Sequence, residues 1–150
     1  MRKFKVLAIV IVVLTSLVCG YLYYSMAVIN PRVAKEISSN PDGERAGIVG
    51  LFTLPSGRKL PANYLREGNK VFVGVDGRWW RELTGSEKQL SVLLRGESLK
   101  GTARVVLNDP DYTRDVFARL RPKVPSWLPA WLNGKLVVIT LQPEGETAND

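Results

Sequence analysis

The sequence predicts a mainly β fold, a six-stranded closed or split β-barrel with one or two short covering helices, preceded by a single N-terminal transmembrane helix. Residues 6–29 are apolar and carry no charge, as in a membrane-spanning helix. Beyond residue 46, runs of alternating or β-branched residues recur at intervals of about ten to twelve, separated by glycine-containing turns. Two segments interrupt this strand pattern, residues 76–83 and a helix that starts at Asp109-Pro110.

The N-terminal apolar segment is long enough to cross a bilayer. Its 24 residues, at about 1.5 Å each, span a hydrocarbon core of about 30 Å with some tilt. Tyr21, Tyr23 and Tyr24 lie toward its far end, where amphipathic rings favour the membrane interface. Asn30-Pro31 is expected to end the helix, because proline lacks the N–H of the helical ladder.

The charges that flank this segment predict its orientation. Three cations (Arg2, Lys3 and Lys5) precede it and two (Arg32 and Lys35) follow it closely. By the positive-inside rule the N-terminus is inside and the domain is periplasmic or otherwise extracytoplasmic.

Two other interpretations of the segment are a cleaved signal peptide and a lipoprotein signal. Ser25-Met26-Ala27 has the small-x-small pattern of a cleavage site. The lipoprotein reading at Cys19 is weaker, because Val18 stands where a small side chain is required.

The composition divides the chain into four parts. Residues 1–29 form the anchor and residues 30–45, rich in Pro, Ser, Asn and charge, form a juxtamembrane linker with room for one helical turn at 33–37. Residues 46–142 form the barrel and residues 143–150 a disordered tail.

Six segments of the body have the pattern of strands. They are 47–54, 58–66, 69–75, 89–95, 98–107 and 135–142. Three turns, at 55–57, 67–69 and 96–98, each contain a residue that tolerates positive φ. The first three strands are therefore expected to form a meander of neighbouring antiparallel strands.

Two segments have helical signals. Residues 76–83 are expected to form a turn followed by a short helix. Residues 109–120 have an Asp109 N-cap with Pro110 at N1. One face of this second helix is apolar and should pack on the barrel; it carries Tyr112, Val116, Phe117 and Leu120.

Composition excludes several functional classes. The chain has no histidine, so it has no Ser-His-Asp or Cys-His catalytic machinery. Cys19 is its one cysteine, which excludes an intrachain disulfide and a cysteine-based zinc site, and we predict no metal. Three of the 21 Lys and Arg residues precede the apolar segment, which leaves 18 against 14 acidic residues in the body. These cations are scattered among acids, so no nucleic-acid partner is expected.

The order of motifs in the body resembles the deazaflavin-dependent nitroreductase and quinone reductase family. The resemblance covers residues 46–142. The matching positions are the segments 53–59 (TLPSGRK), 68–73 (GNKVFV), 79–83 (WWREL) and 103–105 (ARV), and the single residues Pro61, Tyr64 and Gly96. It implies the split β-barrel of pyridoxamine-phosphate oxidases. The family's Trp-Tyr-x-Asn-Leu segment is matched at Trp79 and Leu83, with Trp80 in the Tyr place and Glu82 in the Asn place.

The resemblance also implies a cofactor site for FMN or a deazaflavin coenzyme. Its phosphate would be held by Gly57, Arg58 and Lys59, since free backbone N–H groups at a glycine turn and two cations complement a phosphate dianion. Its ring would lie beside Val73, Gly74, Val75 and Asp76, where a glycine permits close approach. Trp79, Trp80 and Arg81 complete the site, with one Trp packed on the barrel and the other facing a cleft.

Two functions remain open from the sequence. The first is a membrane-anchored reductase of a quinone or nitro-type acceptor, with no catalytic acid or base because the cofactor carries the redox chemistry. The second is a barrel without a cofactor that acts as a binding or structural subunit of a membrane complex. The family implies a homodimer, and the anchor implies contact with membrane lipid.

Overall fold

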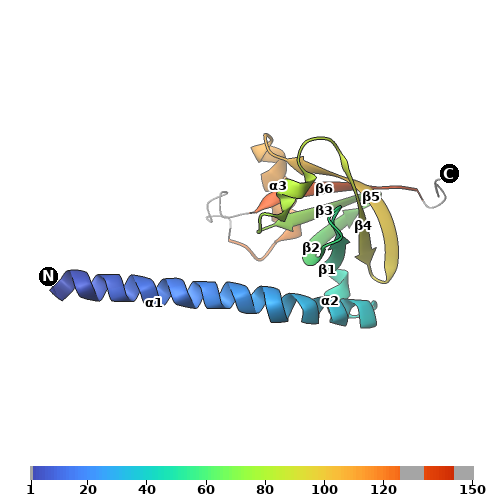
Figure 1. The fold of residues 1–150 in the computed structure, drawn as a ribbon. Helices are drawn as coiled ribbons and strands as arrows, with labels where there is room; N and C mark the ends of the chain where they lie inside the picture. Colours follow the sequence, from blue (N-terminus) through green and yellow to red (C-terminus); the bar gives the residue numbers. More distant parts are fainter. Residues whose placement is uncertain (1, 126–133, 144–150) are drawn as a thin grey trace. The chain divides into compact units, whose positions relative to one another are not determined.

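The computed structural model describes residues 2–125 and 134–143, in two compact units, residues 1–36 and 37–150. Figure 1 shows the course of the chain. The aliphatic and aromatic core is confined to the second unit, which holds every strand that the structure describes.

The first unit is helical. α1 (Arg2–Tyr24) continues through a π-helical turn, η1 (Ser25–Ile29), into α2 (Asn30–Ser39). The helix Lys3–Ser39 is long and apolar enough to cross a membrane, a test that a signal sequence near an N-terminus also passes.

The expectation that Asn30-Pro31 ends the helix is wrong. The Asn30 N–H donates to the Ser25 carbonyl, which is an i to i−5 bond. This wider turn accommodates the missing N–H and the ring of Pro31, so that α2 continues into the segment expected to be a linker.

The second unit is a closed antiparallel barrel, as the sequence predicts. Its strands are β1 (Val49–Thr53), β2 (Lys59–Glu67), β3 (Lys70–Val75), β4 (Lys88–Leu94), β5 (Glu97–Val106) and β6 (Lys135–Leu141). Their order around the barrel is β1-β2-β3-β6-β5-β4, so the predicted meander of β1, β2 and β3 is confirmed.

The hairpin turns fix the register of these strands. Gly57 and Gly68 have positive φ, at 81° and 60°, as their places in the predicted turns require. The β4–β5 turn lies earlier than the predicted 96–98. Leu94 pairs with Glu97, so Arg95 and Gly96 form a two-residue turn, with φ of 47° and 79°. Positive φ at both positions is the signature of a type I′ turn.

Alternate residues of the strands fill the barrel. The largest fully buried side chains include Phe52 of β1, Leu94 of β4 and Ile139 of β6. They belong to one inner cluster with the valines of β3 and with Leu83. Burial of each such side chain contributes about 1.5–3 kcal/mol, so the closed interior is what holds the barrel together.

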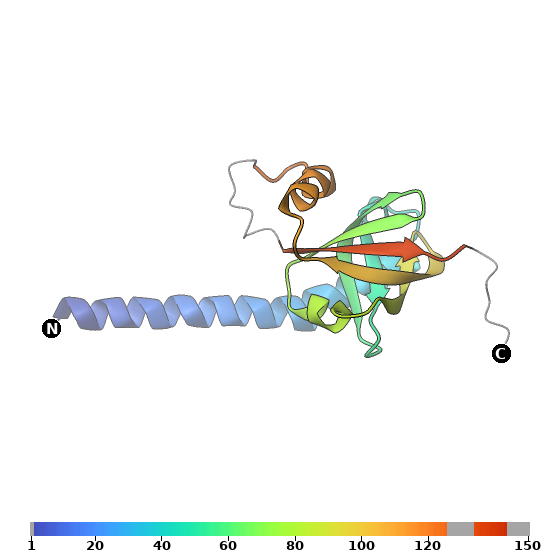
Figure 2. The same cartoon turned by 90° about the horizontal axis from the view of Figure 1, so that it is seen from above.

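A second apolar cluster lies outside the barrel, beneath α3 (Pro110–Leu120). Val116, Phe117 and Leu120 are buried there against Phe72 of β3 and Leu136 of β6, so the predicted apolar face is confirmed. Figure 2 shows α3, in orange, alongside the red strand β6.

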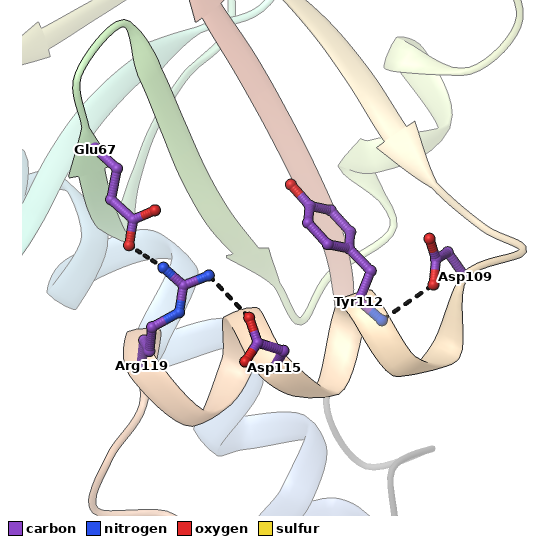
Figure 3. A network of polar contacts seen from close by, with 5 residues as sticks. All are labelled: Glu67, Asp109, Tyr112, Asp115 and Arg119. Carbon is purple, nitrogen blue, oxygen red and sulfur yellow. Dashed lines mark hydrogen bonds and ion pairs between the residues drawn. The ribbon is translucent and has the colours of Figure 1, made fainter.

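Polar contacts fix both ends of α3 (Figure 3). Asp109 caps the helix as predicted, accepting from the Tyr112 N–H at 3.0 Å. Arg119, in the last turn, bonds Glu67 of β2 and, at 3.0 Å, Asp115 of its own helix. The hydrogen bond to Glu67 is the main cause that raises the pKa of Arg119 above its ordinary value.

Two other predictions concern the segment 76–83 and the C-terminal tail. The turn and short helix expected at 76–83 are present, the helix as the 3₁₀ helix η3 (Trp79–Leu83). The disordered tail expected at 143–150 lies, except for Pro143, outside the described residues.

Candidate functional site at one end of the barrel

The β1–β2 hairpin presents two cations at one end of the barrel. The turn closes through two backbone bonds, from the Gly57 N–H to the Leu54 carbonyl at 2.8 Å and from the Leu54 N–H to the Arg58 carbonyl at 2.9 Å. The space beside Gly57 is open, and Arg58 and Lys59 are exposed. The Gly57 N–H is thus bonded within the turn and is not the free phosphate donor expected from the sequence, whereas the Arg58 and Lys59 side chains are exposed to solvent.

A carboxylate from η3 lies on this hairpin. Glu82 accepts a hydrogen bond from Ser56 Oγ at 2.7 Å through one oxygen and pairs with Arg58 Nη2 at 3.0 Å through the other. A hydroxyl and a guanidinium therefore converge on one anionic group, in two segments that the resemblance assigned to the same site. Ser56 and the pairing role of Glu82 were missed in the sequence. The signal for them was the acidic residue in the family's Asn place.

Both tryptophans of η3 contact the barrel. Trp79 and Trp80 are half-buried and pack against the inner cluster, and Leu83 at the end of η3 is buried within it. The guanidinium of Arg81 lies over the Trp80 ring, 5.7 Å from its centroid. The sequence predicts one Trp on the barrel and the other facing a cleft. In the structure both rings reach the core from this 3₁₀ turn at the barrel rim, and both keep a partly exposed side.

Residues at the end of β3 face alternately the barrel interior and α3. Val73 and Val75 point into the barrel and belong to the inner cluster. Gly74 faces α3 instead. A Cβ there would lie 2.9 Å from both Phe117 Cε1 and Arg121 Nη2. The glycine does allow a close approach, and the group that approaches it is the C-terminal end of α3.

Asp76, just past β3, is held by the arginine that follows α3. Arg121 donates to both Asp76 carboxylate oxygens, at 3.0 and 2.7 Å, and its Nη2 also lies 3.4 Å from the Gly74 carbonyl. Its side chain is only 15% exposed, and the guanidinium lies 5.2 Å from the centroid of the Phe117 ring. Asp76 and Gly74 therefore share one partner, the end of α3.

The residues assigned to the cofactor site thus form two groups at the same end of the barrel. In the first, Arg58 and Lys59 lie next to η3 with its Trp79 and Arg81. In the second, the end of β3 is covered by α3. Within residues 2–125 and 134–143, no group of three or more potential ligands could hold a metal ion. The first group presents hydroxyl, guanidinium and ammonium donors that could bind an anion, and its one carboxylate, Glu82, already accepts from two of them.

Comparison with known proteins supports the fold. No protein-family model and no curated protein matches the chain. Among solved structures it is similar to a pyridoxamine 5′-phosphate oxidase-like protein from Listeria innocua, at 12% identity and a TM-score of 0.53, over 72% of this chain and 92% of that one. An F420 reductase matches at 13% identity and a TM-score of 0.42, over 64% and 87% of the two chains. The first likeness shows that the chain shares the barrel fold of that structure.

Proposed function

We propose that this chain is a membrane-anchored reductase that uses FMN or a deazaflavin coenzyme and passes electrons to a lipophilic acceptor of the quinone or nitro type. The observation that carries the proposal is the convergence of Ser56 and Arg58 on the Glu82 carboxylate. That carboxylate stands in for one end of a phosphate, because both groups are anions that accept from hydroxyl and guanidinium donors.

The residues of the hairpin fit a phosphate group. Arg58 and Lys59 supply charge, Ser56 supplies a hydroxyl donor, and Gly57 has no side chain to obstruct the approach. The Arg58–Glu82 pair is partly exposed, at 50% and 32% of the two side chains. Such pairs are worth about 0.2–1 kcal/mol, whereas a charge-assisted bond to phosphate is worth about 1.5–3 kcal/mol. A phosphate can therefore displace Glu82.

The role of the other site residues in this proposal is orientation. The half-buried rings of Trp79 and Trp80 offer flat apolar surface beside the hairpin, with Arg81 next to them. The bound coenzyme would supply the hydride or electrons. The apolar helix Lys3–Ser39 would hold the barrel beside an acceptor dissolved in the membrane. A homodimer and an extracytoplasmic domain complete the proposal.

One alternative has its own support, a barrel without a cofactor that acts as a subunit of a membrane complex. Glu82 already neutralises Arg58, and the end of α3 already covers Gly74. Both contacts occupy places that the resemblance assigns to the coenzyme.

Removal of the two hairpin cations tests the phosphate assignment. The full chain in detergent is titrated with FMN and with a deazaflavin coenzyme, and binding is followed by fluorescence. Replacing Arg58 and Lys59 together by Ala should weaken binding at least about a hundredfold, since each contact is worth about 1.5–3 kcal/mol. The matched control replaces Lys100 and Arg104, two exposed cations of β5, by Ala and should bind normally. Unchanged binding in the hairpin variant would contradict the assignment, and no binding by the wild type would favour the alternative.

A further inference from the structure

A second cluster of charged side chains lies at the other end of the barrel. Because each strand runs antiparallel to its neighbours, the start of β1, the β2–β3 turn and the β4–β5 turn all lie at this end. A pocket of about 290 Å³ opens at this end, and its lining includes Gly47, Tyr64, Arg66, Arg95 and Glu97. Two guanidinium groups and one carboxylate give it a net positive charge.

Arg95 is held at this pocket by an unusual backbone conformation. It occupies the first position of the type I′ turn, with φ of 47°, where Asn or Gly is preferred. No other non-glycine residue in the described part of the chain has a positive φ. Strain of this kind points to a role for the side chain it positions.

The guanidinium of Arg95 has no ion pair or hydrogen bond within residues 2–125 and 134–143. It folds against the backbone of Gly47, where a Cβ would lie 2.6 Å from Nη2. Because Gly47 has no side chain, the guanidinium of Arg95 has room at the pocket wall.

The other polar residues define the pocket around that cation. Arg66 pairs through Nη1 with Glu97 at 2.9 Å, and both side chains are exposed, at 40% and 56%. A pair this exposed is weak, so Arg66 can turn toward a stronger anion. Tyr64 is fixed by its hydroxyl, which donates to the Ala46 carbonyl at 3.1 Å.

We propose that Arg95 and Arg66 bind a phosphate group in this pocket, separately from the coenzyme site. Arginine forks match the oxygens of phosphate, and two of them make the pocket selective for a dianion or phosphodiester over chloride. The phosphate can belong to an anionic lipid headgroup or be free in solution. The lipid source rests on the proposed membrane anchor. Gly47 of this pocket comes only 18 positions after Ile29, the last residue of the apolar segment, so an anchored chain could bring anionic headgroups within reach.

The test uses the full chain in neutral detergent micelles. Inorganic phosphate is titrated calorimetrically at constant ionic strength. Native mass spectrometry then compares adducts of phosphatidylglycerol with those of phosphatidylcholine. Saturable phosphate binding identifies a free-anion site, and a preference for phosphatidylglycerol alone identifies a headgroup site. Absence of both overturns the proposal.

Three variants assign the binding to this pocket. Arg95→Asn removes the guanidinium but keeps a residue that the turn prefers, and it should weaken binding about tenfold or more. Glu97→Gln removes a repelling charge and should tighten binding. Arg104→Gln, an exposed arginine of β5 outside the pocket, is the matched control and should bind normally. Wild-type affinity in Arg95→Asn, in a protein that melts at the wild-type temperature or above, would refute the proposal.

Discussion

Replacement of Glu82 by Gln tests whether a coenzyme phosphate uses the donors that this carboxylate now occupies. In the structure its carboxylate accepts from Ser56 and pairs with Arg58, so it competes for the donors that would hold a coenzyme phosphate. Gln keeps the size of the side chain and one oxygen to accept from Ser56. The substitution therefore removes the negative charge with little change in packing.

The expected gain has two parts. Release of the partly exposed Arg58 contributes about 0.2–1 kcal/mol. Removal of repulsion between Glu82 and a phosphate contributes about 1 kcal/mol per unit charge at 4 Å in water, less at physiological salt. A total of about 1–2 kcal/mol predicts that Glu82→Gln binds FMN roughly 5–30 times more tightly than the wild type.

Quenching of flavin fluorescence during titration of the full chain measures this gain, and repetition at higher salt should reduce it. A thermal melt without ligand checks that the variant is folded. Equal or weaker FMN binding in Glu82→Gln would refute the reasoning, because it would mean that the coenzyme phosphate does not share the donors of Glu82.

Three further predictions are made, one from the packing of α3 and two from the proposed function. Gly74→Ala should destabilise the barrel by about 1–3 kcal/mol, measured by chemical denaturation, because its Cβ would meet Phe117 and Arg121 at 2.9 Å; unchanged stability would mean that the end of α3 does not pack there. Protease added to intact spheroplasts should remove the domain. Digestion only after lysis would contradict the predicted orientation and place the domain inside the cell. Analytical ultracentrifugation of the full chain in detergent should show a dimer, and a monomer at high concentration would favour a subunit of a mixed complex.

The fold was largely predictable because its signals are local. β-Branched alternation and glycine turns located all six strands, and Asp109-Pro110 gave the start of α3. The β4–β5 turn was misplaced because cross-strand pairing of Leu94 with Glu97 sets it and forces Arg95 into positive φ. The predicted helix end at Pro31 was wrong because a π-helical turn just before the proline lets the helix continue past it.

The site was less predictable because its contacts join distant segments. The sequence drew attention to Arg58 and Gly74, but the partner of each comes from another element. Glu82 reaches Arg58 from η3, and Phe117 fills the space beside Gly74 from α3. Residue type alone identifies a cation or a glycine that suits a ligand. Only the packing of the chain shows which protein group already lies there.

The absorbance spectrum of the full chain, purified in detergent without added coenzyme, tests the central claim most directly. If the chain is a flavin or deazaflavin reductase, the protein should carry the visible band of an oxidised flavin, or a deazaflavin band at shorter wavelength. Dithionite should bleach a flavin band. A protein that shows neither band, and gains neither when titrated with FMN or a deazaflavin coenzyme, would contradict the reductase and leave the barrel as a subunit without a cofactor.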